Sequence, residues 1–140
     1  MIFFDTSVLV SAVLVQNTHH QRSLAAYLDA NKRHCCCAAH NLAEVYSTLT
    51  RLPGNQRMLS DQVLLLLDDI RDRFTLVGLD PEEYCSTIAD AAAEGIIGGT
   101  IYDALIARCA LKAKAAVIYT WNVEHFRRCG PEIAKRVRTP

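Results

Sequence analysis

The chain has 140 residues, of which 51% are apolar and 21% charged, with few glycines and prolines. This composition is typical of an ordered globular protein and excludes disordered and collagen-like chains. The length suits one domain, so we expect residues 1–140 to form a single domain. No apolar run approaches the roughly 20 residues of a membrane span, and no basic segment precedes the first apolar stretch as in a signal peptide. We therefore expect a soluble, cytoplasmic protein that does not insert into a membrane.

The formal net charge is zero, but the charges are unevenly distributed along the chain. Residues 60–103 carry ten acids against two Lys/Arg, whereas residues 104–140 carry eight Lys/Arg against two acids. A basic C-terminal third can contact phosphate groups without the whole protein being basic. An ordinary solvated surface has the same pattern, so charge alone does not identify a nucleic-acid-binding protein.

Strand and helix patterns alternate along the sequence. In chain order, they predict a strand at residues 2–4, helices at 8–15 and 19–30, a strand at 35–39, helices at 41–49 and 60–74, a strand at 75–79, helices at 81–94 and 100–114, a strand at 116–119, a short helix at 121–128 and an edge strand at 136–138. Asp80, Pro81 and Glu83 form a helix start, with an N-cap, a proline in the first turn and a capping box. The alternation predicts an α/β fold, a three-layer α/β/α sandwich with a mostly parallel central sheet.

Three consecutive cysteines, Cys35, Cys36 and Cys37, occupy the second predicted strand, and His34 and His40 flank them. Their spacing lacks the two-residue gaps of common zinc sites. Because a free cysteine behaves as a small apolar side chain, we interpret this segment as a buried strand with reduced thiols. A soft-metal site is the alternative.

Three acids fall where a parallel sheet places its ligand crevice, beyond the carboxyl ends of the strands. Asp5 closes the first strand, Glu44 lies just inside the helix after the second, and Asp103 begins the helix before the fourth. Carboxylates that converge without a matching Lys or Arg raise one another's pKa and destabilise the fold, and a divalent cation removes that conflict. Mg²⁺ suits such an open acidic crevice because it keeps several waters. The pattern therefore predicts a metal ion that activates water.

Each acid also has a structural interpretation. Asn41-Leu-Ala-Glu44 and Thr100-Ile-Tyr-Asp103 both have the spacing of a capping box, so Glu44 and Asp103 are also candidates for capping helix starts. Asp5 has no evident structural task, since it closes an apolar strand. Both interpretations stay open for Glu44 and Asp103 on the sequence alone.

Four segments follow one another at separations found in a known family. They are Phe4-Asp5-Thr6-Ser7, Asn41-Leu-Ala-Glu44-Val, Tyr102-Asp103-Ala-Leu-Ile-Ala and Tyr119-Thr120-Trp-Asn122-Val-Glu-His-Phe126. Together they resemble the PIN domain, specifically the VapC-type toxins, over essentially the whole chain. The resemblance implies a single PIN-like α/β/α sandwich and a Mg²⁺- or Mn²⁺-dependent endoribonuclease that is the toxin of a type II toxin–antitoxin pair.

The resemblance also implies roles for acidic and amide side chains. Asp5, Glu44 and Asp103 match the family's acidic triad, which holds the metal ion. Asn122 falls where many members carry a fourth acid, and it completes the predicted catalytic set. Asparagine offers a carbonyl oxygen but no charge, which puts a tightly held second metal in doubt.

Substrate contacts and partners follow from the same resemblance. Thr6, Ser7 and Thr120 match hydroxyl positions near the family's active site and are candidate substrate contacts. The expected partners are an RNA substrate, a small antitoxin that blocks the acidic crevice, and a second copy in a homodimer. We expect Trp121, beside the site, to pack against the protein rather than stack on an unpaired base. The RNA that is cut is not encoded in these motifs.

Three other functions compete on the residues alone. A phosphohydrolase of the haloacid dehalogenase type would use Asp5 as nucleophile, but it needs an acid two residues later, where Ser7 stands. A receiver-like phosphoacceptor domain needs an acid pair at the first strand, which the lone Asp5 does not supply. A PIN fold that binds a partner without catalysis is the third, opposed by the intact triad and favoured by Asn122.

Overall fold

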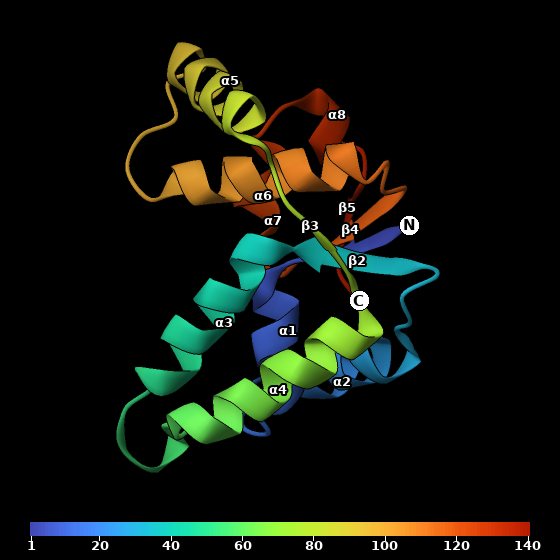
Figure 1. Ribbon diagram of the computed structural model, residues 1–140, viewed down its shortest axis with the longest axis vertical. Coiled ribbons are helices and arrows are strands. Elements are labelled where there is room, and N and C mark those ends of the chain that lie inside the picture. Colours follow the sequence, from blue (N-terminus) through green and yellow to red (C-terminus); the bar gives the residue numbers. More distant parts are fainter.

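A sheet of five parallel strands forms the centre of the computed structural model, which describes residues 1–140 (Figure 1). The strands are β1 (Ile2–Phe4), β2 (Cys35–Ala38), β3 (Thr75–Val77), β4 (Val117–Tyr119) and β5 (Val137–Arg138). Their order is β3-β2-β1-β4-β5, and every neighbouring pair is parallel. β1 is therefore the central strand, with β2 and β3 on one side of it and β4 and β5 on the other. In such sheets ligands bind beyond the carboxyl ends of the strands where the order reverses, here between β1 and β4.

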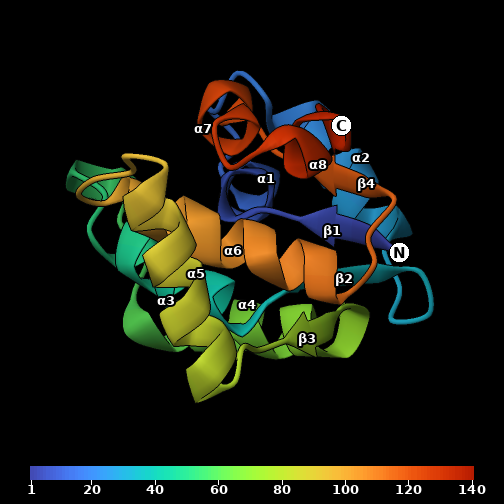
Figure 2. The ribbon, with the colours of Figure 1, turned by 90° about the horizontal axis from the view of Figure 1, so that it is seen from above.

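Helices cover both faces of the sheet, which confirms the predicted three layers (Figures 1 and 2). They are α1 (Thr6–Val13), α2 (His20–Asp29), α3 (Ala39–Thr50), α4 (Ser60–Arg73), α5 (Pro81–Ala93), α6 (Thr100–Lys112), α7 (Val123–Arg127) and α8 (Pro131–Ala134), with a short 3₁₀ helix η1 (Gly54–Gln56). In Figure 1, α1 to α4 lie below the sheet and α6 to α8 above it, with α5 packed on the outside of α6. None of these helices is long and apolar enough to cross a membrane.

Adjacent residues of the inner strands point to opposite faces and so build two apolar cores. Phe4, Cys35 and Cys37 pack with the helices of the lower layer, whereas Phe3 and Cys36 pack with those of the upper layer. Both faces are buried, which explains why these strands are continuously apolar. The predicted buried strand of small thiols is confirmed, and burial raises the pKa of Cys36 to about 11 and that of Cys37 to about 12. These side chains therefore stay protonated at neutral pH.

The predicted helix ends are partly confirmed. At the start of α5, Asp80 accepts a hydrogen bond from the Glu83 backbone N–H at 2.8 Å, and Glu83 accepts one from that of Asp80 at 2.9 Å, as in a capping box. The first helix begins at Thr6 rather than residue 8 and ends at Val13, so Val15 lies outside it and is 78% exposed. The short α8 and η1 were not predicted, because a single turn shows no apolar period.

A buried tyrosine ties α2 to α4. The Tyr27 hydroxyl donates to Asp69 Oδ2 at 2.6 Å, and Arg73 Nε donates to the same oxygen at 2.8 Å. Burial and the bond to Asp69 raise the pKa of Tyr27 well above its usual range. Desolvation acts to raise the pKa of Asp69, but the bonds from Tyr27 and Arg73 hold it below its ordinary 3.8.

We expect Tyr27→Phe to lower the free energy of unfolding by about 1 kcal/mol, the usual net contribution of one hydrogen bond. Because the folded-state pKa of Asp69 is depressed, the contribution is present at neutral pH and lost as the pH falls below about 4. Urea denaturation at the two pH values measures both effects. Tyr46→Phe is the control, since its hydroxyl makes an exposed bond to Ser60 Oγ at 3.0 Å. Equal losses of unfolding free energy in Tyr27→Phe and Tyr46→Phe would contradict a stabilising role for the bond between Tyr27 and Asp69.

Candidate active site

An open cleft of about 610 Å³ lies beyond the carboxyl ends of β1 and β4. The residues that follow β1 form its floor, one face of α3 forms a wall, and α6 and the segment after β4 complete it. Of the residues predicted from sequence, it is lined by Asp5, Thr6, Ser7, Glu44, Asp103 and Asn122. Thr120 is fully buried beneath it. The fold thus brings the three acids, separated widely in sequence, to one place.

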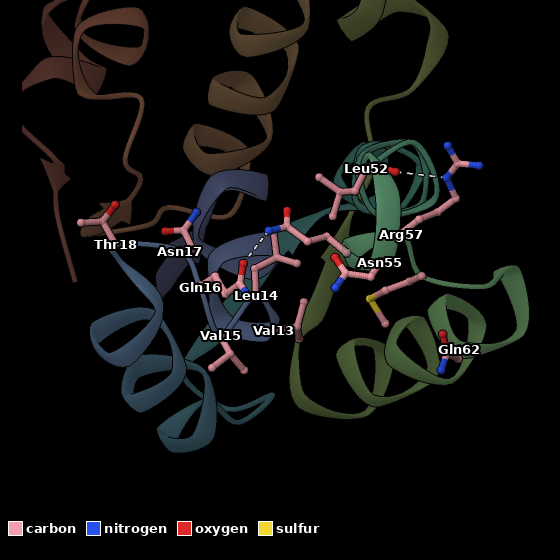
Figure 3. A pocket seen from close by; sticks show the side chains of 12 residues that line it. Val13, Leu14, Val15, Gln16, Asn17, Thr18, Leu52, Asn55, Arg57 and Gln62 are labelled. Carbon is pink, nitrogen blue, oxygen red and sulfur yellow. Dashed lines mark hydrogen bonds between the residues drawn. The ribbon is translucent and has the colours of Figure 1, made fainter.

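The largest hollow of the protein, about 770 Å³, lies elsewhere (Figure 3). It is formed by residues 13–18 after α1 and by the connection between α3 and α4. Gln56 Nε2 donates to Gln16 Oε1 at 2.7 Å within it, and Arg57 Nε donates to the Leu52 carbonyl at 3.1 Å. Its lining contains no Asp, Glu, His or Cys. Because it offers no group for hydrolysis or for binding a hard metal ion, we place the candidate site in the acidic cleft.

Asp5 is only 2% exposed, and its carboxylate is fixed by short hydrogen bonds. Its Oδ2 accepts from Ser7 Oγ at 2.6 Å, from Thr120 Oγ1 at 2.8 Å and from the Ser7 backbone N–H at 3.2 Å. The other oxygen, Oδ1, receives none of these bonds. Burial raises the pKa of Asp5, although the Ser7 and Thr120 bonds act to lower it. The carboxyl is therefore held rigidly, and its second oxygen, Oδ1, accepts no side-chain hydrogen bond.

Glu44 is placed by a relay of hydrogen bonds from the end of β2. The Ala38 backbone N–H donates to Asn41 Oδ1 at 2.7 Å, and Asn41 Nδ2 donates to Thr6 Oγ1 at 2.7 Å. Thr6 in turn donates to Glu44 Oε2. Asn41 is completely buried. It orients Glu44 through Thr6, a task that the sequence did not reveal.

The capping interpretations of Glu44 and Asp103 are wrong. The helix α3 begins at Ala39, so Asn41 already lies within the first turn and Glu44 in the second. The N-cap of α6 is Gly99, without a side-chain cap. Asp5, for which no structural task was expected, is instead the N-cap of α1. Glu44 and Asp103 are therefore not needed to start their helices.

The cleft concentrates negative charge. Burial, and then the charge of Asp5, raises the pKa of Asp103; the charge of Glu44 adds to the rise, and His125 opposes it. His125 Nδ1 lies 3.3 Å from Asp103 Oδ2, and His40 Nε2 lies 3.7 Å from Glu44 Oε1. Sequence reasoning missed both histidines, although the four-residue spacing of His40 and Glu44 on a helix was a signal. No Lys or Arg is paired with any of the three acids.

The donor set fits a hard divalent cation. Asp5 Oδ1 and the carboxylates of Glu44 and Asp103 offer oxygen ligands, and the side chains of Glu44 and Asp103 are 29% and 18% exposed to the open cleft. No three acidic, histidine or cysteine side chains lie close enough together to hold a metal ion by themselves. Mg²⁺ takes only one or two carboxylates and keeps several waters, so it does not require a direct bond from every acid.

Trp121 is packed rather than free to stack on a base. Its ring lies 3.7 Å from that of His19, nearly parallel, with the Arg22 guanidinium 5.2 Å from its centroid. Its Nε1 donates to Ser23 Oγ at 2.8 Å, and its backbone N–H donates to Ser7 Oγ at 2.9 Å. Trp121 therefore helps to orient the hydroxyl that binds Asp5.

At the rim of the cleft, Asn122 is exposed and its amide side chain makes no hydrogen bond within the protein, whereas its backbone N–H donates to Thr120 Oγ1 at 2.9 Å. Across from it, the ring of His40 stacks on that of Tyr102, with centroids 5.4 Å apart. The rim therefore combines a free amide with an aromatic pair.

The sequence profile of the PIN domain matches residues 2–130, and the chain belongs to the PIN domain family. Within this family it is a homologue of VapC-type ribonuclease toxins. It is 33% identical over 136 residues to Ribonuclease VapC40 of Mycobacterium tuberculosis, covering 95% of this chain and 97% of that one.

Two solved structures share the fold at lower identity. VapC20 of Mycobacterium tuberculosis, described as a sarcin–ricin loop cleaving toxin, has a TM-score of 0.72 at 12% identity and covers 89% of this chain and 92% of its own. VapBC2 of Rickettsia felis, bound to a fragment of its promoter DNA, has a TM-score of 0.65 at 20% identity and covers 99% and 98%.

The competing enzyme and receiver interpretations do not fit this geometry. The strand order differs from the 2-1-3-4-5 order of flavodoxin-like receiver domains. As a nucleophile, Asp5 would have to attack from a carboxylate that is almost fully buried and whose Oδ2 already accepts three hydrogen bonds. Its environment suits a fixed ligand better than an attacking group.

The raised pKa of Asp103 gives a testable pH dependence. Below its ordinary value of 3.8 the carboxyl is neutral in both states, so Asp103→Asn should leave the metal-free melting temperature unchanged. As the pH rises through the folded-state pKa, the wild type loses stability relative to the variant, because its folded state binds the proton more tightly. In chelator, the variant should therefore become the more stable protein towards neutral pH.

Thermal melts of the two proteins from about pH 3 to pH 8 measure this difference. Asp72→Asn is the control, since Asp72 is exposed on α4 and makes no ion pair. A variant less stable than the wild type at neutral pH would show that Asp103 is not under repulsion.

Proposed function

We propose that this protein is a Mg²⁺- or Mn²⁺-dependent endoribonuclease and the toxin of a type II toxin–antitoxin pair. The observation that carries the proposal is that Asp5, Glu44 and Asp103 line one open cleft with no Lys or Arg paired to them. The relationship to a named ribonuclease supports RNA as the substrate. We further propose that residues 1–140 act as one domain, in the cytoplasm.

In this proposal the three acids would hold the metal ion between them, one or two directly and the rest through bound water, and Asn122 would add a carbonyl oxygen at the rim. When bound, the cation supplies Lewis acidity that makes water a better nucleophile and offsets charge developing on phosphorus. Water would attack the phosphorus and release a proton to solvent, the bond from phosphorus to the leaving nucleotide oxygen would break, and that oxygen would take up a proton from solvent, which gives a phosphomonoester and a free hydroxyl. Asp5 is pre-oriented for its part by Ser7 and Thr120.

The hydroxyls predicted to contact substrate have partners within the protein. Ser7 and Thr120 donate to Asp5, and Thr6 donates to Glu44. Thr120 is also completely buried. These bonds give all three hydroxyls an orienting role. Thr6 and Ser7 also line the cleft, so of the three only they are candidates for contact with RNA.

We propose two protein partners for this chain. A small antitoxin would place an Arg or Lys in the cleft, since a cation relieves the same repulsion as a metal ion. The toxin–antitoxin complex among the structural neighbours supports this partner. A second copy of the chain would cover exposed apolar side chains such as Leu64 and Leu65 of α4, forming a homodimer.

We expect Asp103→Asn to reduce metal-dependent RNA cleavage by on the order of a hundredfold or more, while the protein stays folded. The change removes one negative charge from the metal site and leaves the size of the side chain nearly fixed. Asn122→Asp should act in the opposite direction and tighten metal binding, because it adds a charged oxygen ligand. The assay incubates purified, antitoxin-free protein with total RNA in Mg²⁺, Mn²⁺ or chelator, and maps the new RNA ends.

Asp72→Asn is again the control and should cleave as the wild type does. A folded Asp103→Asn variant with undiminished, chelator-sensitive cleavage would refute the role of Asp103. Absence of chelator-sensitive cleavage by the wild type would favour the alternative of a PIN fold that binds its partner without catalysis.

A further inference from the structure

A single face of α3 lines the cleft along the whole length of the helix. The residues that contribute it are spaced three or four apart, as one helical face requires: His40, Ala43, Glu44, Ser47, Thr48 and Arg51. The opposite face, with Val45 and Leu49, is completely buried in the core. The orientation of this wall is therefore fixed by packing.

The two halves of this face differ in chemistry. The first half carries His40 and the acid Glu44. The second half carries no acid. It has the hydroxyls of Ser47 and Thr48 and the guanidinium of Arg51, all of which can donate hydrogen bonds, and none of these side chains makes a hydrogen bond or ion pair within the protein. A helical Thr commonly bonds the carbonyl four residues back, as Thr50 does to Tyr46 at 2.7 Å. The free donors therefore face the open cleft.

Arg51 is well placed to contact a polyanion without neutralising the acids. It is the C-cap of α3 and lies seven residues after Glu44, which corresponds to about 10 Å along the helix axis. That distance separates its charge from the acidic end of the cleft. Arg51 is exposed, and its guanidinium forms no ion pair.

The basic C-terminal third does not supply this contact. Arg127 pairs with Glu124, and Lys135 and Arg136 both pair with Glu132. None of its Lys or Arg residues lines the acidic cleft, where Arg51 is the one Lys or Arg side chain. The basic C-terminal third therefore adds no cationic side chain to the lining of this cleft.

We propose that Ser47, Thr48 and Arg51 form a phosphate-binding track that holds the backbone of single-stranded RNA on one side of the bond that is cut. Guanidinium groups bind phosphate through paired, charge-assisted hydrogen bonds, and hydroxyls donate to phosphate oxygens. These three side chains attract the phosphates of the RNA backbone, whereas the acids at the other end of the cleft repel them. This inference rests on the proposed function, since it assigns a substrate contact to the same cleft.

A structural role for Arg51 makes a different prediction. A cation at the end of α3 also stabilises the helix dipole. That role is served equally by lysine and affects only stability, whereas phosphate binding favours the planar guanidinium and affects substrate affinity.

The experiment compares Arg51→Gln and Arg51→Lys with the wild type on a short single-stranded oligoribonucleotide that contains a mapped cut site. We expect Arg51→Gln to raise KM about tenfold, as for loss of one charged hydrogen-bonding contact, with kcat nearly unchanged. Arg51→Lys should recover part of the loss. Arg33→Gln is the matched control, because Arg33 is exposed and unpaired. It lies just before β2, at the opposite end of the strands from the cleft.

A second readout does not depend on cleavage. Fluorescence anisotropy measures binding of the labelled oligoribonucleotide to Asp103→Asn protein in Mg²⁺, with and without Arg51→Gln, over a range of salt. The Arg51 change should weaken binding and reduce the slope of log affinity against log salt by about one.

The outcomes separate the two proposals. If the wild type does not cleave RNA but its binding depends on Arg51, the proposed activity fails and the track stands. If KM, binding and salt slope for Arg51→Gln equal those for Arg33→Gln, the track is refuted. A change in melting temperature without any change in KM or in oligoribonucleotide binding would also overturn it.

Discussion

Burial of the Asp5 carboxylate is the constraint around which the site is built. Removing an ionised carboxylate from water is costly unless hydrogen bonds compensate for the lost solvent. Ser7, from the first turn of α1, and Thr120, from the end of β4, supply that compensation. They meet Asp5 because β1 and β4 are parallel neighbours whose chains both end at this edge. The sheet order is thus a condition for the site.

The same edge of the sheet carries acidic side chains that no Lys or Arg neutralises. Histidines lie beside Glu44 and Asp103, but no Lys or Arg pairs with the acids, and Arg51 stands apart along α3. Opposite charges are therefore separated within one cleft instead of cancelling. A polyanion meets an attractive end and a repulsive end, and a small cation at the acids makes the whole cleft favourable to it.

The sequence predicted the fold and the acids for reasons that are local. Strand and helix periods are visible in short windows, and Asp5, Glu44 and Asp103 were placed together because parallel strands carry their crevice at one edge. The roles of Asp5 and Asn41 at helix starts were not predictable, since a shift of one or two residues in a helix boundary changes which side chain can cap it. The place of His125 depends on how α7 packs near α6, which no spacing in the sequence encodes. Arg51 continues the cleft face of α3, but it lies beyond residue 49, where the sequence pattern ended that helix.

Asp5 and Asp103 differ in their structural roles, and under the proposed function this difference governs how activity is lost by mutation. Asp5 also caps the start of α1, so replacements that cannot cap a helix remove a structural bond together with the proposed metal ligand. Asp103 caps nothing and is under electrostatic strain. Under the proposed function, random inactivation should therefore yield stable, silent proteins through position 103, whereas changes at position 5 to residues that do not cap helices also lower stability.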